Sequence, residues 1–222
     1  MSLKSLLKIE HGITALIGGG GKTTCMYALA EELSKTARVI VCTSTHIYPP
    51  EHLPCLVSPD AEQIRQAFSR ENVICVGTAG ENGKFSPPEL PFAELEKLAD
   101  YVIVEADGSR GRPLKAHAAH EPVIPENTNQ TILLLGMSGI GKTISEAAHR
   151  PELYAARLGV AQDTVVTPTL AAGFLELENL HTRVLLNQAE TEEQKADARR
   201  LAARLNCPVC MGALQKGWVE EC

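Results

Sequence analysis

The sequence predicts an α/β fold in which helices cover both faces of a mostly parallel β-sheet. Short apolar runs rich in β-branched residues, such as Ile13–Ile17 and Tyr101–Val104, are typical of buried parallel strands. Segments with apolar residues at helical spacing, such as Met26–Leu33, separate these runs. A chain of 222 residues, 44% hydrophobic and 22% charged, is long enough for one sizeable core, so we expect a single domain over residues 1–222.

The remaining elements follow in order. Pro49, Pro50 and Pro54 break the chain after the second strand, and Asn82-Gly83 indicates the tip of a small hairpin that ends at Ser86. The long connection 107–129 carries a pattern of charges, and residues 159–179 form a mixed segment without a clear assignment. The further strands are expected at residues 38–42, 73–76, 101–104, 131–135, 183–186 and 208–214, and the further helices at 60–69, 91–99, 151–158 and 192–205.

A glycine-rich bend between the first strand and the first helix predicts a phosphate-binding loop. Glycines free the backbone to curl, so that N–H groups and the positive end of the following helix can face an anion. Lys22 would reach the outer phosphates of a nucleotide, and the Thr23 hydroxyl would bind Mg²⁺. The alternative is an ordinary turn between a strand and a helix. The predicted nucleotide-binding residues are Gly18, Gly19, Gly20, Gly21, Lys22, Thr23 and Thr24.

Two acids follow the strand Tyr101–Val104. Glu105 and Asp107 stand where an enzyme with a phosphate loop holds Mg²⁺ or its water, so we expect them, together with Lys22, to form the catalytic and metal-binding side of the site. Of the two, Glu105 is the first choice. The alternative is that both acids only end a strand and cap a turn, since Asp-Gly is also common turn chemistry.

Five basic residues follow these acids: Arg110, Arg112, Lys115, His117 and His120. Cations beside bound phosphates could neutralise transition-state charge or hold an anionic ligand. A solvated charged loop explains the same composition.

The strand 183–186 ends in Asn187-Gln188-Ala189-Glu190. This segment partly matches the N-K-x-D signature with which many GTPases bind guanine, where a carboxylate accepts hydrogen bonds from the base. Gln188 replaces the lysine, and Glu190 is one methylene longer than aspartate. A plain turn at the end of a strand is the alternative.

A second stretch, Gly136–Thr143, satisfies G-x-x-x-x-G-K-[ST] letter for letter and follows an apolar strand. It predicts a rival site, that of a small-molecule kinase. Its surroundings are less favourable, because Pro151 interrupts the following helix and no later strand ends in an acid suited to Mg²⁺. Lys142 in place of Lys22 would then bind the phosphates.

Other features are less specific. Thr43, Thr45 and His46 end the second strand at the same edge as the phosphate loop, so a role in nucleotide or metal binding competes with that of an ordinary loop. Cys207 and Cys210 have zinc or redox spacing, but no second cysteine pair has zinc spacing, so buried small residues are the preferred interpretation.

Composition excludes several classes of function. A net charge of −6, a pI near 5.7 and few aromatic residues disfavour a nucleic-acid-binding protein. The absence of a long apolar run or a secretory signal, and an odd number of cysteines, lead us to expect a cytoplasmic protein with reduced thiols.

Several blocks of sequence together resemble one family. In order, these are GGGGKTT, CTSTHIYPP, VEADGSRGRPLKAHAAHEPVIP, HRPEL and LLNQAE. They resemble the YqeC-type selenium-dependent hydroxylase accessory proteins over nearly the whole chain, and the central block is the most specific.

The resemblance implies a P-loop NTPase-like fold, related to metallocentre-maturation GTPases, that binds ATP or GTP with Mg²⁺. It implies a role in maturing a selenium-dependent molybdenum hydroxylase, with that enzyme or its cofactor as a partner. By position it places Lys22 and Thr23 on phosphate and Mg²⁺, Glu105 and Asp107 near the metal, and Arg110, Arg112 and Lys115 on an anionic partner. A non-catalytic carrier of a selenium or cofactor intermediate remains an alternative.

Overall fold

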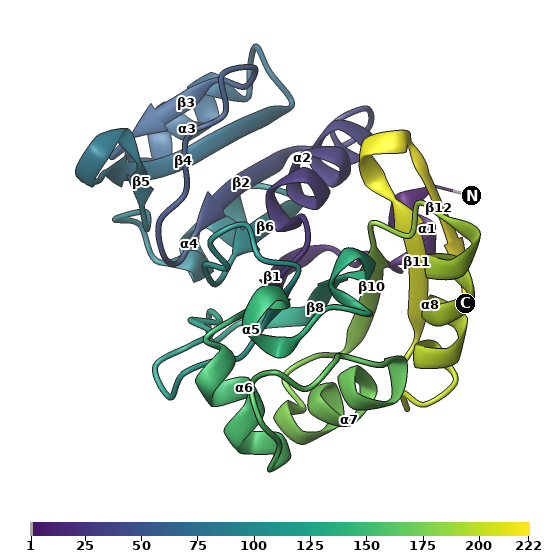
Figure 1. Ribbon diagram of the computed structural model, residues 1–222. Coiled ribbons are helices and arrows are strands. Elements are labelled where there is room, and N and C mark those ends of the chain that lie inside the picture. The colour runs from purple at the N-terminus through teal and green to yellow at the C-terminus, as the bar shows by residue number, and fades with distance from the viewer. Residues whose placement is uncertain (1) are drawn as a thin grey trace.

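The computed structural model describes residues 2–222 and has a mixed, ten-stranded β-sheet at its centre. The strand order is β12-β11-β10-β8-β1-β6-β2-β4-β3, and β5 pairs with β4. Every pairing is parallel except those of β12 with β11 and of β5 with β4. Figure 1 shows β3 and β4 at one end of the sheet and β11 and β12 at the other. The predicted fold class is therefore confirmed.

The bounds of the elements are as follows. The sheet strands are β1 (Gly12–Gly18), β2 (Val39–Thr43), β3 (Cys55–Val57), β4 (Val73–Ala79), β5 (Phe85–Ser86), β6 (Tyr101–Glu105), β8 (Thr128–Gly136), β10 (Arg183–Asn187), β11 (Val209–Ala213) and β12 (Trp218–Glu221); β7 (Leu114–Lys115) and β9 (Ala148–His149) form a separate pair. The helices are α1 (Leu3–Leu6), α2 (Lys22–Leu33), α3 (Ala61–Ala67), α4 (Phe92–Leu98), α5 (Ile144–Ala147), α6 (Pro151–Leu158), α7 (Pro168–Glu178) and α8 (Glu192–Ala202).

The alternation of side chains along each strand builds a core on each face of the sheet. In β1, Leu16 packs with the buried residues of α1 and α2, whereas Ala15 and Ile17 pack on the opposite face with residues of α6, α7 and α8. Ile13 also points to that opposite face, toward α3 and α4. Helices therefore cover both faces, which explains why β1, β2 and β6 are buried at every position and mostly apolar.

Local sequence signals explain where several helices begin. Asp60 caps α3 by a capping box with Gln63, at the start of the helix predicted over residues 60–69. Thr167 accepts a hydrogen bond from the Leu170 amide and Pro168 follows it, so the segment described above as mixed contains the helix α7. The predicted hairpin is confirmed as the antiparallel pair of β4 and β5.

The sheet positions the site. Strand β1 lies between β6 and β8, and Leu16 pairs in register with Glu105. Because these strands are parallel, the loop after β1 and the loop after β6 leave the same edge of the sheet, side by side.

Candidate functional site

The loop Gly18–Gly21 adopts a backbone that favours glycine. Gly18, Gly20 and Gly21 have φ angles of +92°, +82° and +114°. A β-carbon on Gly18 would lie 2.3 Å from the Leu134 carbonyl oxygen, so the loop also packs tightly against the neighbouring strand β8. Both the dihedral angles and the space therefore require glycine here.

The amides of this loop divide into two groups. Those of Gly19 and Gly20 donate to the carbonyl oxygens of Leu134 and Arg112, at 2.9 and 3.2 Å. Within residues 2–222, the four amides of 21–24 donate to no acceptor. The first turn of α2 thus presents consecutive unpaired N–H groups at its positive end, which is the arrangement that binds phosphate.

Lys22 lies buried beneath the loop. Its Nζ donates to the Gly18 carbonyl oxygen at 2.7 Å and lies 2.9 Å from Oδ1 of Asp107. Glu105 Oε1 is 3.9 Å away, and Ser109 Oγ lies 3.4 Å from the same nitrogen. The structure therefore brings together the lysine and both predicted acids.

Thr23 and Glu105 form the neighbouring part of the site. The Thr23 hydroxyl donates to Glu105 Oε2 at 2.8 Å, and Thr43, at the end of β2, donates to the backbone oxygen of Glu105 at the same distance. Burial raises the pKa of Glu105, and the charge of Asp107 adds to this, although Lys22 and Thr23 oppose the shift. Glu105 is thus a buried carboxylate with incomplete charge compensation.

These oxygens fit Mg²⁺. The ion prefers hard oxygen ligands and in nucleotide sites uses one or two carboxylates together with phosphates and water. A threonine hydroxyl beside an undercompensated carboxylate supplies that donor set. Among the residues described, no group of three or more His, Cys, Asp or Glu side chains is arranged to hold a metal ion by itself.

Asp107 has a different environment from Glu105. Its Oδ2 accepts the Gly18 amide at 2.8 Å and lies 2.6 Å from His117 Nε2 and 3.6 Å from Lys115 Nζ, while Oδ1 faces Lys22. Burial alone would raise the pKa of Asp107, but Lys22, His117 and Lys115 together hold it well below its usual range. Asp107 therefore serves as the buried counter-ion of three bases, and Glu105 has the freer oxygens.

Asp107 is at the centre of a larger group of charged side chains, from which two branches of ion pairs extend. We call this group the charge cluster; its members are Lys22, Glu105, Asp107, Lys115, His117, Glu121, Arg150, Arg157 and Glu178. In one, Lys115 donates to the Gly108 carbonyl at 2.6 Å and lies 3.1 Å from Glu121, which also pairs with Arg150. In the other, His117 Nδ1 lies 2.6 Å from Glu178, which also pairs with Arg157. The cluster contains four carboxylates and five bases, and each base is paired with a carboxylate of the cluster.

The predicted anion-binding residues have separate environments. Lys115 is buried within the charge cluster and does not face solvent. Arg112 is exposed, and its guanidinium donates to the Glu146 carbonyl oxygen. Arg110 is exposed with a φ of +50°, and His120 is exposed. Of the three residues expected to meet an anionic partner, only the two arginines are accessible.

The predicted base-binding segment lies beside the phosphate loop. Asn187 Nδ2 donates to the Gly20 carbonyl at 2.7 Å, and its Oδ1 accepts the Leu214 amide at 3.1 Å. Gln188, at φ +64°, accepts a hydrogen bond from Ser138 at 2.6 Å. Glu190 pairs with Lys216 at 2.7 Å on the surface. Asn187 thus ties the phosphate loop to the end of β11.

The second glycine-lysine loop does not have the form of a phosphate cradle. The amides of Gly141, Ile144 and Ser145 donate to the carbonyl oxygens of residues 166, 164 and 162, at 2.9 to 3.0 Å. The Thr143 amide and hydroxyl both donate to Glu146, and α5 has only four residues. Because internal acceptors already use these amides, this loop offers few donors to a phosphate.

Of the less specific candidates, only Thr43 contacts the charge cluster within residues 2–222, through the backbone oxygen of Glu105. His46 Nδ1 lies 3.0 Å from Ser86 Oγ, beside a pocket of about 740 Å³, and Thr45 donates its amide to Thr43. Cys210 is buried and its thiol donates to the Leu6 carbonyl, while Cys207 is half-buried. Burial raises the pKa of Cys210 to about 11. Both cysteines are free thiols in the structure.

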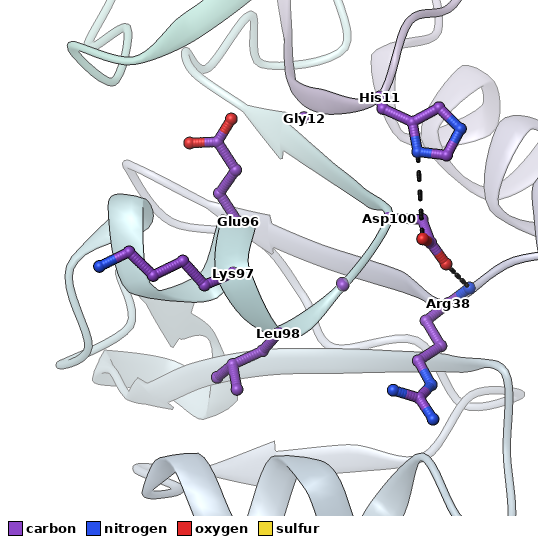
Figure 2. Close-up of a pocket in the computed structure, with 8 residues that line it drawn as sticks. His11, Gly12, Arg38, Glu96, Lys97, Leu98 and Asp100 are labelled. Carbon is purple, nitrogen blue, oxygen red and sulfur yellow. Dashed lines mark hydrogen bonds and ion pairs between the residues drawn. The ribbon is translucent and has the colours of Figure 1, made fainter.

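Another pocket, of about 590 Å³, lies at the opposite end of β1 (Figure 2). His11, Arg38 and Asp100 line it, with the Asp100 carboxylate between the other two. A seven-residue strand separates the two ends by about 20 Å. Ligands of open α/β sheets bind beyond the carboxyl ends of the strands, so this pocket is on the wrong edge for the phosphate loop.

The sequence did not indicate the roles of several charged residues. The sequence marks His117 only as one of a group of cations, and it gives no separate signal for Glu178, Arg157, Glu121 or Arg150. Glu121 and Arg150 do fall within the blocks HEPVIP and HRPEL. Glu178 is the last residue of a helix that was not predicted, so no local signal marked it.

The fold and the site define an α/β protein with a P-loop NTPase-like arrangement. A family model described as YqeC protein matches residues 14–152. The chain is 32% identical over 162 residues to "Uncharacterized protein YqeC" of Escherichia coli (strain K12). The aligned stretch covers 69% of this chain and 63% of that protein, which is less than two thirds of the relative's length. The chain belongs to the YqeC family.

None of the helices in residues 2–222 has the length and apolar character needed to cross a membrane.

Proposed function

We propose that this chain binds and hydrolyses a nucleoside triphosphate with the help of Mg²⁺. The observation that carries the proposal is the convergence of three side chains at the unpaired amides of α2. Lys22 lies within 3.9 Å of Glu105, and Thr23 donates to the same carboxylate at 2.8 Å. Lys22 and Thr23 come from helix α2 and Glu105 from the end of strand β6, and each has the chemistry that phosphoryl transfer requires.

In this proposal each group has a defined task. Lys22 exchanges Asp107 for oxygens of the outer phosphates, and the amides of residues 21–24 bind the phosphate chain. Thr23 and Glu105 hold Mg²⁺, which offsets the negative charge that develops on the phosphates. Catalysis then consists of positioning and electrostatic stabilisation.

The family resemblance supplies the biological setting. We propose an accessory role in maturing a selenium-dependent molybdenum hydroxylase, with that enzyme or its cofactor as the partner. The exposed Arg110 and Arg112, which follow the acids of the site, are the residues that would meet an anionic partner.

The test is a titration of the full chain with fluorescent ATP and GTP analogues, with and without Mg²⁺. Lys22→Ala is expected to abolish binding, and Lys142→Ala, in the second loop, to leave it unchanged. Loss of binding only in the Lys142 variant would overturn the proposal and support the kinase alternative. Glu190→Gln is expected to weaken GTP binding alone if Glu190 leaves Lys216 to bind guanine.

A further inference from the structure

The charge cluster contains a buried histidine to which the proposed function assigns no task. His117 lies between two carboxylates, with Nε2 2.6 Å from Asp107 Oδ2 and Nδ1 2.6 Å from Glu178 Oε2. Its side chain and those of both acids are at most 2% exposed. The contact with Glu178 is doubled, because the His117 amide donates to Glu178 Oε1 at 2.9 Å.

The geometry defines the charge of this histidine. A neutral imidazole has one N–H donor and one lone pair, so one ring nitrogen would turn its lone pair toward a carboxylate lone pair. Only the imidazolium donates to both acids. The two carboxylates accordingly raise the pKa of His117 although burial opposes the shift.

The position of this imidazolium matters for Lys22. To bind a phosphate, Lys22 must leave Asp107, which would lose its 2.9 Å partner in a place without solvent. A buried carboxylate that loses a partner is strongly destabilised. His117 and Lys115 remain beside Asp107 when the lysine leaves, so the charge stays compensated and Lys22 can transfer to the ligand at little cost.

We propose that His117 and Glu178 are positioning residues that hold Asp107 in place and thereby release Lys22 for phosphate. Glu178 fixes the imidazole from the last residue of α7. Arg157 of α6 fixes Glu178 in turn and also donates to the His117 carbonyl oxygen at 2.6 Å. The inference rests on the proposed function, since it assigns a task in nucleotide binding.

Three variants of the full chain test the proposal. His117→Gln is expected to raise the dissociation constant for a fluorescent nucleotide about 10- to 100-fold, the loss typical of an outer partner of a binding group. Glu178→Gln is expected to have a smaller effect in the same direction, and it serves as the test if His117→Gln does not fold. The control His11→Gln changes a histidine that pairs with Asp100 at the other edge of the sheet, and is expected to leave affinity unchanged.

A rescue separates positioning from mere packing. Adding Asp107→Asn to His117→Gln removes the charge that retains Lys22, so the double variant is expected to bind more tightly than His117→Gln alone. If His117 only supports the fold, the second substitution brings equal or greater loss, which would overturn the inference. Circular dichroism and thermal unfolding confirm that each variant is folded.

A nucleotide-free measurement makes the two proposals separable. The ¹⁵N–¹H long-range spectrum of the full chain near neutral pH is expected to show both ring nitrogens of His117 protonated. A neutral ring with intact nucleotide binding would refute the inference and leave the proposed function standing. A charged ring in a chain that binds no nucleotide would refute the proposed function, and with it the release of Lys22 for phosphate.

Discussion

The tight bend at Gly20 provides a quantitative test of the phosphate loop, with a matched control in the second loop. Gly20 and Gly141 have nearly the same φ angle, +82° and +84°. A β-carbon on Gly20 would lie 2.3 Å from the Gly136 nitrogen and 2.4 Å from its Cα, whereas one on Gly141 would meet nothing within 4 Å. Alanine at the two positions therefore differs in steric fit, while both positions have the same left-handed φ.

The expected magnitudes follow from these two terms. A left-handed backbone costs an alanine about 1–2 kcal/mol at either site. At Gly20 the clash with backbone atoms adds about 1–3 kcal/mol, as for overpacking of a filled site. Gly20→Ala should thus lower the free energy of unfolding by about 2–5 kcal/mol, and Gly141→Ala by about 1–2 kcal/mol. The gain from a stiffer unfolded chain is the same in both variants and cancels in the comparison.

Urea denaturation measures both free energies, and the fluorescent nucleotide titration follows in buffer. We expect Gly20→Ala to lose nucleotide affinity and Gly141→Ala to keep it. Equal free energies of unfolding in the two variants would show that Gly20 does not pack against Gly136 as described. Loss of nucleotide binding in Gly141→Ala alone would move the phosphate site to the second loop.

Three further predictions concern other parts of the chain. Asn187→Ala leaves the Gly20 carbonyl and the Leu214 amide without their partner, so urea denaturation should show a loss of about 2–4 kcal/mol; no change would mean that water replaces the side chain. The low pKa of Asp107 contributes stability above its unfolded pKa of about 4, which is lost as the pH falls through the folded pKa. Acid unfolding should therefore be less steep in Asp107→Asn, and an unchanged acid limb would contradict the ion pairs. Cys25, Cys42, Cys75 and Cys210 are buried, so a thiol reagent should not reach these four in the native protein and should modify all seven cysteines only after unfolding. Rapid modification of all seven in the native protein would contradict this burial.

Much of the fold was predictable because local patterns specify it. The central strands are mostly apolar because both faces of the sheet are covered and every position is buried, and this pattern stands out in the sequence. The elements that were missed have weaker signals. Strand β12 is half-exposed and pairs only with β11, and α7 contains Gly173 in its interior, which lowers helix propensity.

The candidate site was predictable in its members but not in their contacts. The glycine bend, Lys22 and the two acids could be assigned to one edge of the sheet from the order of strands and helices alone. Which acid faces the lysine depends on the register of β1 with β6, where Leu16 pairs with Glu105, and on the side chain of His117, which arrives from a later loop. Sequence spacing does not encode either relation, since both depend on contacts between distant segments.

The contrast between Glu105 and Asp107 gives the two acids separate roles. Asp107 has Lys22, Lys115 and His117 within 3.6 Å, whereas Glu105 has one hydroxyl donor and a lysine at 3.9 Å. A divalent cation gains most beside the carboxylate whose charge is least compensated, so Mg²⁺ is expected on Glu105. Asp107 is then the anchor that Lys22 leaves when phosphate arrives. Glu105→Gln should abolish the Mg²⁺ dependence of nucleotide binding while Lys22 still contributes, and retained Mg²⁺ dependence in that variant would assign the metal elsewhere.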